Sequence, residues 1–184
     1  MRYSKVIRWG SLLSFVLVVA CGQDSSAPQS DGAASGGGSE PGITKLEGST
    51  DSPNYAFVDL DGNKGSLADY KGKVLIVDVW ATWCPPCKQE LPHFIELYDE
   101  YKDKGFEMVG LSVDDSPDVL KPFIKEYNLN YTIHWGNGQE VQSVFGPIPG
   151  IPTTFIIDKE GNIVKKLVGY QDKAVFEDAI KSLL

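Results

Sequence analysis

Apolar runs predict buried β-strands in the second half of the chain. Residues 74–80 (VLIVDVW) form an almost unbroken apolar segment rich in β-branched side chains, which is typical of a strand buried on both faces. Residues 106–113 and 153–157 have the same character. A turn signal at 158–161 follows the third run, so residues 162–168 are predicted to form an antiparallel neighbouring strand.

Amphipathic helical patterns lie between and after these predicted strands. They begin after Cys84, at Ser116–Pro117 and at Asp172, which suits a helix cap. The side chains expected to be buried are Leu91, Phe94, Ile95 and Tyr98, then Leu120, Phe123, Ile124 and Tyr127, then Val175, Phe176, Ala179, Ile180 and Leu183. The alternation predicts an α/β domain with a mixed, mostly parallel central sheet flanked by helices. Chemistry in such a domain belongs at the carboxyl end of a central strand.

The first 20 residues are typical of an export signal. Residues 1–8 are basic, and residues 9–20 carry no charge. This apolar run is too short to cross a bilayer, which needs about 20 residues. The stretch Leu17–Cys21 resembles the lipobox of bacterial lipoproteins, a family in which the signal is cut before the cysteine and the cysteine is acylated. Cys21 is therefore the expected lipid site.

A flexible tether and one folded domain are expected after Cys21. Residues 21–50 are rich in Gly, Ser, Asp and Ala and hold few bulky apolar side chains, so they cannot offset the entropy of folding. As a coil, such a segment spans roughly 30 Å root-mean-square. Residues 51–184 are long enough for one domain of ordinary size.

Charge excludes nucleic acid as a partner. The whole chain has a formal net charge of −8. The part after residue 20 holds 14 lysines, no arginine and all 25 acids, which leaves a net charge of −11. Phosphate binding needs clustered basic side chains, which this part of the chain lacks.

The three cysteines point to one reactive pair and one residue with another role. Cys84 and Cys87 stand at Cys-x-x-Cys spacing, where the strand at 74–80 gives way to a helix. Zinc would need two further ligands, and only His93 and His134 are candidates once Cys21 is acylated. We therefore expect no metal.

The redox interpretation needs no further residues. A helix amino terminus stabilises a thiolate through its free N–H groups and its dipole. Pro85 suits the first turn of the helix, where its missing N–H costs nothing. Cys84 is expected to attack a disulfide, and Cys87, one turn into the helix, to resolve the mixed disulfide.

The segment Val77–Lys88 resembles the active site of the thioredoxin superfamily. With the tether and the Trp-Cys-Pro-Pro-Cys sequence, the chain is similar to the TlpA/ResA-like membrane-anchored thiol–disulfide oxidoreductases. The likeness extends over the domain, including Pro92 inside the helix, an extra helix–strand insert around 116–134, and Gly150–Thr154 before a late strand. It implies a thioredoxin fold with an N-terminal extension and this insert.

The resemblance also implies how substrate binds. The peptide bond before Pro152 is expected to be cis, with the proline facing the cysteines. The backbone of Ile151 is expected to pair with the substrate chain as a short strand. Trp83, Pro85 and Pro86 are expected to line the approach to Cys84.

Two acids are implied as catalytic. Asp78 interrupts the apolar strand, so its carboxyl group is expected to be buried with a raised pKa. In thioredoxins the matching acid moves a proton to and from the resolving thiol; many TlpA/ResA-like proteins carry Asn there, so Asp78 is a departure. Glu90 corresponds to an acid that tunes the cysteines. The alternative for Asp78 is a solvated acid at the end of the strand. The alternative for Glu90 is a solvated acid on the surface of the helix.

Other aromatic and basic residues have structural interpretations. Trp80 is expected in the core, and Lys88 in solvent. The two histidines are expected to be structural or exposed. Tyr131 and Trp135 are either core aromatics of the insert or part of a docking surface.

The sequence thus predicts an exported, membrane-tethered thiol–disulfide oxidoreductase. It is expected to reduce disulfides of exported proteins, for example apocytochrome c during cytochrome maturation, and to act as a monomer without a cofactor. No nucleotide or flavin motif is present, so its electrons are expected from a membrane thiol donor. The predicted location is the cell envelope, lipid-anchored with the domain on the periplasmic or other extracytoplasmic side of a bacterial membrane.

Three alternatives share the fold. The same dithiol chemistry run backwards forms disulfides in clients. A peroxiredoxin-like peroxidase needs Pro-x-x-x-Thr-x-x-Cys, whereas Thr82 lies two residues before Cys84 and no proline stands at the required distance. A copper chaperone resembling the Sco proteins needs Cys-x-x-x-Cys and a distant histidine, for which His134 is the candidate.

Overall fold

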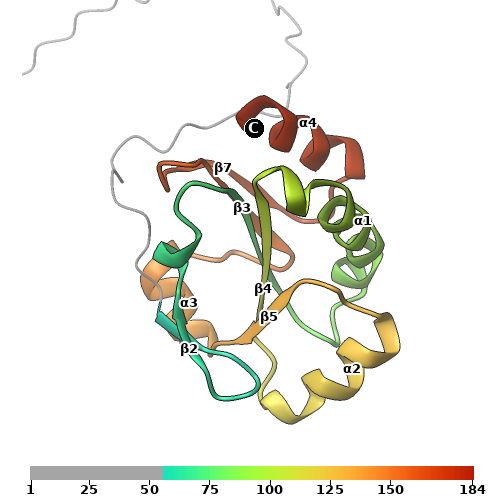
Figure 1. The fold of residues 1–184 in the computed structure, drawn as a ribbon. Helices are drawn as coiled ribbons and strands as arrows, with labels where there is room; N and C mark the ends of the chain where they lie inside the picture. Colours follow the sequence, from blue (N-terminus) through green and yellow to red (C-terminus); the bar gives the residue numbers. More distant parts are fainter. Residues whose placement is uncertain (1–55) are drawn as a thin grey trace, which may run out of the picture. The chain divides into compact units, whose positions relative to one another are not determined.

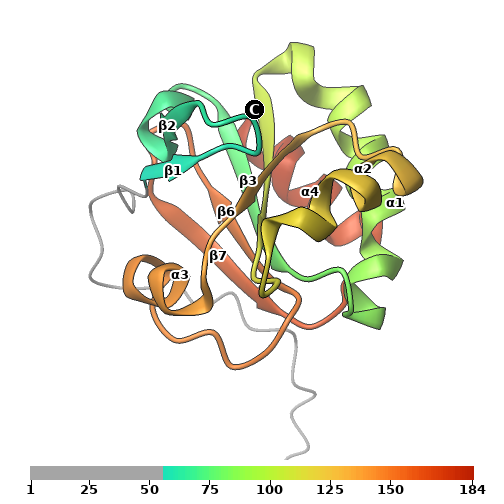
Figure 2. The same ribbon diagram turned by 90° about the horizontal axis from the view of Figure 1, so that it is seen from below.

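A computed structural model describes residues 56–184, which form a five-stranded sheet in the order β5-β4-β3-β6-β7 (Figures 1 and 2). The strands are β3 (Val74–Trp80), β4 (Phe106–Ser112), β5 (Thr132–Trp135), β6 (Thr153–Ile157) and β7 (Ile163–Val168). β3 pairs in parallel with β4, and β4 in parallel with β5. β3 with β6, and β6 with β7, are antiparallel. The sheet is mixed, as predicted, but only half of its pairings are parallel, so the expectation of a mostly parallel sheet was wrong.

Helices cover both faces of the sheet. They are α1 (Pro85–Tyr101), α2 (Leu120–Tyr127), α3 (Gly138–Phe145) and α4 (Lys173–Leu183). α1 and α4 lie on one face and α3 on the other (Figures 1 and 2). Alternate residues of β3 enter the two halves of the core: Val74 and Ile76 pack with the α1 side, and Leu75 and Val77 with the α3 side. The apolar run of β3 is therefore buried on both faces, as predicted.

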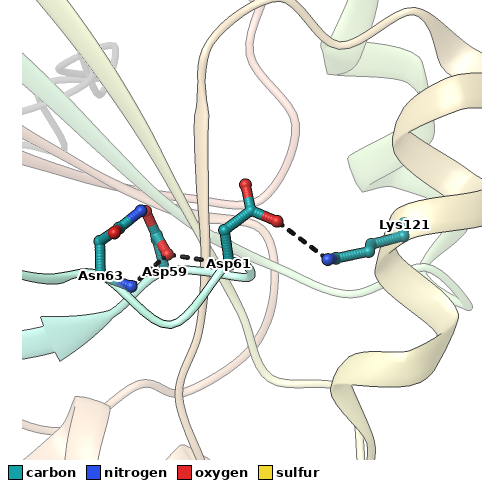
Figure 3. Close-up of polar contacts among 4 residues, drawn as sticks. All are labelled: Asp59, Asp61, Asn63 and Lys121. Atoms are coloured by element: carbon teal, nitrogen blue, oxygen red, sulfur yellow. Dashed lines mark hydrogen bonds and ion pairs between the residues drawn. The ribbon is translucent and has the colours of Figure 1, made fainter.

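A hairpin of β1 (Ala56–Val58) and β2 (Lys64–Ser66) precedes the sheet. The Asp59 carboxylate organises its turn by accepting the backbone N–H groups of Asp61 and Asn63, at 2.9 and 2.8 Å, and the Asn63 side-chain amide at 2.8 Å. Asp61 pairs with Lys121 Nζ of α2 at 2.9 Å (Figure 3). The ion pair is exposed and therefore contributes little energy, but it marks where the hairpin meets α2.

The predicted insert is present, with its start in a different form. Ser116 caps a 3₁₀ turn at Pro117–Val119, and α2 begins only at Leu120. The insert ends in β5, which lies at the edge of the sheet.

Asp172 precedes α4 as predicted, but its carboxylate makes no hydrogen bond to the helix N–H groups. It accepts the Tyr170 hydroxyl at 3.2 Å instead. The prediction that its side chain caps the helix was therefore wrong.

Helix α3 was not predicted. It has only eight residues, and its apolar side chains span little more than one turn. Asn137 caps it by accepting the N–H groups of Gln139 and Glu140. A pattern this short does not stand out from a loop.

Several sequence predictions fall outside the described residues. These are the signal at 1–20, lipidation of Cys21, the tether at 21–50 and the domain boundary at 51. Among the helices of residues 56–184, none is both long and apolar enough to span a bilayer.

Candidate active site

The cysteine pair lies where β3 passes into α1. The Cys84 N–H donates to the carbonyl of Ala81 at 3.1 Å, which closes a tight turn after β3. Cys84 is then the N-cap of α1, and Pro85 is the first helical residue. The Cys87 N–H donates to Cys84 Sγ at 3.2 Å. The sulfur of Cys84 therefore takes the place of a capping oxygen at the positive end of the helix.

Cys84 and Cys87 form a disulfide, with their Cα atoms 5.3 Å apart. Both side chains are almost fully covered in this state, with 2% of Cys84 and none of Cys87 exposed. The residues around Cys84 are more open: Trp83 is 64% exposed and Pro85 is also exposed. Pro86 is half-buried. Cys84 thus lies next to exposed residues, whereas Cys87 is fully covered.

The loop before β6 approaches Cys84 from the other side. The peptide bond between Ile151 and Pro152 is cis, as the resemblance implied. The carbonyl oxygen of Ile151 lies 3.8 Å from Cys84 Sγ. The Thr153 hydroxyl donates to the Gly150 carbonyl at 2.6 Å, which helps to fix the loop. A backbone edge therefore lies directly beside the sulfur that is expected to react.

A cavity of about 200 Å³ opens next to this edge. Its lining is mainly apolar and comes from Trp83, the α3 side chain Val141, and Val113, Ile148 and Ile151. Polypeptide bound along the Ile151 backbone has room here for one apolar side chain.

Asp78 is buried within the sheet, with 1% of its surface exposed. Burial raises the pKa of its carboxyl group to about 7, and a hydrogen bond from Thr154 Oγ1 at 3.1 Å opposes the rise. The interpretation of Asp78 as a solvated acid at the strand end is therefore wrong.

Glu90 is also buried, although it belongs to a helix. The Gln171 N–H donates to its Oε1 at 2.5 Å, while Oε2 has no hydrogen-bond partner among residues 56–184. Burial raises the pKa of Glu90 to about 8, and the charge of Asp78 contributes to the rise. The two carboxyl groups thus influence each other, and burial raises the pKa of both.

Trp80 and Tyr131 belong to the core. Trp80 is fully buried and packs against Phe123 with the ring centroids 5.3 Å apart. Tyr131 is buried between Phe94 and Tyr98. Both are therefore structural aromatics.

Trp135 and Lys88 lie nearer the surface. Trp135 is half-buried, and its Nε1 donates to the Asp114 carbonyl at 2.6 Å. Lys88 Nζ lies 5.7 Å from the centre of the Phe123 ring.

Neither histidine has the surroundings of a metal ligand. The His134 ring stacks on Phe57 at 3.5 Å, and neither of its ring nitrogens has a hydrogen-bond partner in the described part of the chain. His93 packs near Tyr170, with the ring centroids 5.9 Å apart. Within residues 56–184, no group of three or more His, Cys, Asp or Glu side chains is arranged to hold a metal ion.

Sequence reasoning missed the residues that hold the turn before Cys84. Thr82 donates both its N–H and its hydroxyl to the carboxylate of Asp114. The available signal was the place of Asp114 at the carboxyl end of β4, the neighbour of β3 in the sheet.

The chain is similar to known proteins over most of its length. A model of the AhpC/TSA family matches residues 49–166. The thiol–disulfide oxidoreductase ResA of Bacillus thuringiensis subsp. konkukian is 38% identical over 139 residues, which cover 76% of this chain and 80% of that protein. ResA of Bacillus subtilis is 35% identical over 137 residues, which cover 74% of this chain and 76% of that protein.

Solved structures share the fold. The crystal structure of a putative thiol:disulfide interchange protein DsbE from Chlorobium tepidum superposes with a TM-score of 0.67 at 29% identity. The match covers 72% of this chain and 94% of that one. The predicted thioredoxin fold is confirmed.

Proposed function

The chain belongs to the AhpC/TSA family and is a thiol–disulfide oxidoreductase, and on that premise we propose that it reduces disulfides of exported proteins while anchored to a bacterial membrane. The observation that carries the proposal is the position of Cys84 Sγ. It lies between the helix N–H of Cys87 at 3.2 Å and the Ile151 carbonyl at 3.8 Å. The first contact favours a thiolate, and the second lies on an edge where a client strand can bind.

The reaction transfers two electrons from the dithiol to the client. The Cys84 thiolate attacks one sulfur of the client disulfide, and the other client sulfur leaves as a thiolate and takes up a proton. The Cys87 thiol then loses its proton and attacks Cys84 Sγ. The Cys84–Cys87 disulfide forms, and the client leaves with both cysteines reduced.

The buried carboxyl groups serve the second step. The Cys87 thiol is covered by the core, so its proton needs an acceptor inside the protein. Asp78 and Glu90 have pKa values raised to about 7 and 8, near the range in which a carboxylate accepts a proton at neutral pH. Together they can take the proton from Cys87 and return it when the disulfide is reduced.

The client binds beside Cys84 in extended form. Its backbone pairs with Ile151, next to the cis proline, and one of its side chains enters the apolar cavity beside Trp83. Pro85 and Pro86 follow Cys84 directly in the sequence, and we expect them to line the same approach. A mainly backbone interaction suits clients of varied sequence.

The remaining parts of the proposal rest on the sequence. Acylated Cys21 and the tether at 21–50 hold the domain outside the cytoplasm, near a membrane thiol donor that reduces the disulfide again. In this setting apocytochrome c, whose haem-binding cysteines must be reduced, is the expected kind of client. The domain acts as a monomer and needs no cofactor.

Trapping of clients tests this function. The Cys87→Ser chain, expressed in its own cell envelope, is expected to accumulate mixed disulfides between Cys84 and exported proteins with paired cysteines. The Cys84→Ser chain is the control and is expected to trap none. If only the Cys84→Ser control trapped clients, the roles of the two cysteines would be reversed. If the Cys87→Ser chain trapped no exported protein, the proposed function would be contradicted.

A further inference from the structure

Asp114 carries a buried carboxylate two residues beyond the end of β4. Only 4% of the residue is exposed. Its Oδ2 accepts hydrogen bonds from the Thr82 N–H at 2.9 Å and from the Ser112 hydroxyl at 2.8 Å. Its Oδ1 accepts the Thr82 hydroxyl at 2.7 Å. One side chain therefore joins the end of β4 to the residue two positions before Cys84.

Hydrogen-bond donors compensate for the burial of this carboxylate. None of the ion pairs found within residues 56–184 includes Asp114. A buried charge is costly unless it is paired or hydrogen-bonded, and bonds to an ionised acceptor are about twice as strong as neutral ones. The bonds from Thr82 are thus strong enough to fix the turn in which it lies.

Thr82 occupies the turn that sets the position of Cys84. This turn is closed by the Cys84 N–H on the Ala81 carbonyl at 3.1 Å. Within the turn, Thr82 donates both its N–H and its hydroxyl to the Asp114 carboxylate. A shift of Thr82 relative to Asp114 would therefore break these two hydrogen bonds.

Asp114 is itself held from the edge of the sheet. Its carbonyl accepts Trp135 Nε1 from the end of β5 at 2.6 Å. The preceding residue, Val113, donates its N–H to the Trp80 carbonyl at the end of β3, at 2.9 Å. The ends of three neighbouring strands thus meet at this acid.

We propose that Asp114 is a positioning residue, which through Thr82 holds Cys84 against the amino terminus of α1 and beside Ile151. In the dithiol state, this position keeps the Cys84 sulfur on the Cys87 N–H, where a thiolate is stabilised. When the anchor is lost, Cys84 spends less time there. The thiolate is then less stable, and its attack on disulfides is slower.

The same loss shifts the equilibrium of the cysteine pair. In exchange with glutathione, the protein dithiol and one glutathione disulfide give the protein disulfide and two glutathione molecules. Loss of the anchor destabilises the dithiol side, so the equilibrium moves toward the protein disulfide. This consequence follows from the chemistry of the pair and is independent of which clients the protein serves.

The test compares matched variants of the full chain. Thr82→Val removes one hydroxyl and keeps the shape, whereas Thr82→Ser retains the hydroxyl. Asp114→Ala removes all three bonds of the carboxylate. Asp115→Ala is the control for charge, because Asp115 is the adjacent acid and is exposed. For each variant, the measurements are the equilibrium with glutathione, the rate of Cys84 alkylation by iodoacetamide at pH 7, and the thermal midpoint of unfolding.

Thr82→Val and Asp114→Ala are expected to shift the glutathione equilibrium toward the disulfide at least threefold, which is about 14 mV for a two-electron couple. Alkylation is expected to slow at least threefold. Thr82→Ser and Asp115→Ala are expected to match the unaltered chain within twofold. If Asp114→Ala fails to fold, the Thr82 pair decides the question. The proposal would be overturned if Thr82→Val and Thr82→Ser gave the same glutathione equilibrium and the same rate of alkylation. This holds whatever the thermal midpoint of Thr82→Val.

Discussion

The backbone N–H of Cys87 points at the sulfur of Cys84 across 3.2 Å, at the first turn of α1. This contact joins the two cysteines within one helix turn and gives them different surroundings. Cys84 is the helix cap and borders the exposed Trp83, whereas Cys87 lies deeper and is fully covered. The proposed division into an attacking and a resolving cysteine rests on this difference.

Stability should fall with rising pH because of the two buried acids. Asp78 and Glu90 have folded-state pKa values of about 7 and 8, raised by burial from 3.8 and 4.5. The folded state therefore holds these protons more tightly, and stability is lost as the pH rises from about 4 to 8. We expect Asp78→Asn and Glu90→Gln each to raise the free energy of unfolding of the disulfide form at pH 8, by about 2 kcal/mol or more.

Urea titration at pH 4 and pH 8 measures this effect. At pH 4 each variant is expected to show little of this gain, because pH 4 is near the ordinary pKa values of these groups, so the unfolded state then also holds much of these protons. The matched control is Glu96→Gln, which changes an exposed acid on the same helix and should give no gain at pH 8. Equal gains at both pH values would show that neither acid titrates as described.

His134 should act in the opposite direction. Burial lowers its pKa to about 4, although the charge of Asp59 opposes the shift. The neutral ring is favoured in the folded state, so its contribution to stability is present above about pH 6.5 and is lost as the pH falls toward 4. His134→Phe keeps an aromatic ring on Phe57 and cannot be protonated.

We therefore compare the unfolding free energy of His134→Phe with that of the unaltered chain. Between pH 7 and pH 4.5, the variant is expected to gain about 2–3 kcal/mol of stability relative to the unaltered chain. A pH-independent difference for His134→Phe would contradict the account of this site.

Trp83 should matter for client binding and little for folding. It is 64% exposed and lines the cavity beside Ile151. We expect Trp83→Ala to raise KM for a disulfide-containing peptide about fivefold, equal to about 1 kcal/mol, with kcat changed less than twofold. Val119→Ala, which removes an exposed apolar side chain from the insert, is the control. A fall in kcat without a change in KM would place Trp83 in the chemical step.

Cys21 should decide where the protein is found. A lipid on this cysteine would hold the chain to a membrane, and Cys21→Ala is expected to move the protein to the soluble fraction after cell lysis and high-salt washing. Cys21→Ala that stays with the membranes would remove the lipid anchor from the proposal. The cysteine pair at 84 and 87 is left intact, so dithiol activity is expected to persist.

Local patterns revealed most of the fold and the cysteine pair. The strand at 74–80 and the helix after Cys84 are marked by periodicity within a few residues, and the Cys-x-x-Cys spacing lies between them. The burial of Asp78 followed from its apolar neighbours. These features depend on residues that are close in the sequence.

What the sequence did not reveal depends on contacts between distant segments. Thr82 and Asp114 are 32 residues apart, and Glu90 meets Gln171 across 81. The pattern of the helix alone does not show whether a glutamate is solvated or is covered by a loop near the carboxyl end of the chain. For the same reason, the stacking of His134 on Phe57 could not be predicted, because the hairpin was not recognised.

The reduction potential of the Cys84–Cys87 pair tests the central claim most directly. The full chain is equilibrated with glutathione buffers of known ratio, and the dithiol fraction is counted by alkylation. As a reductant of exported proteins, it is expected to have a potential near −200 mV or below, among those of glutaredoxins and thioredoxin. A potential near −120 mV, the value of a strong disulfide-forming oxidant, would contradict the direction of electron flow proposed for this protein.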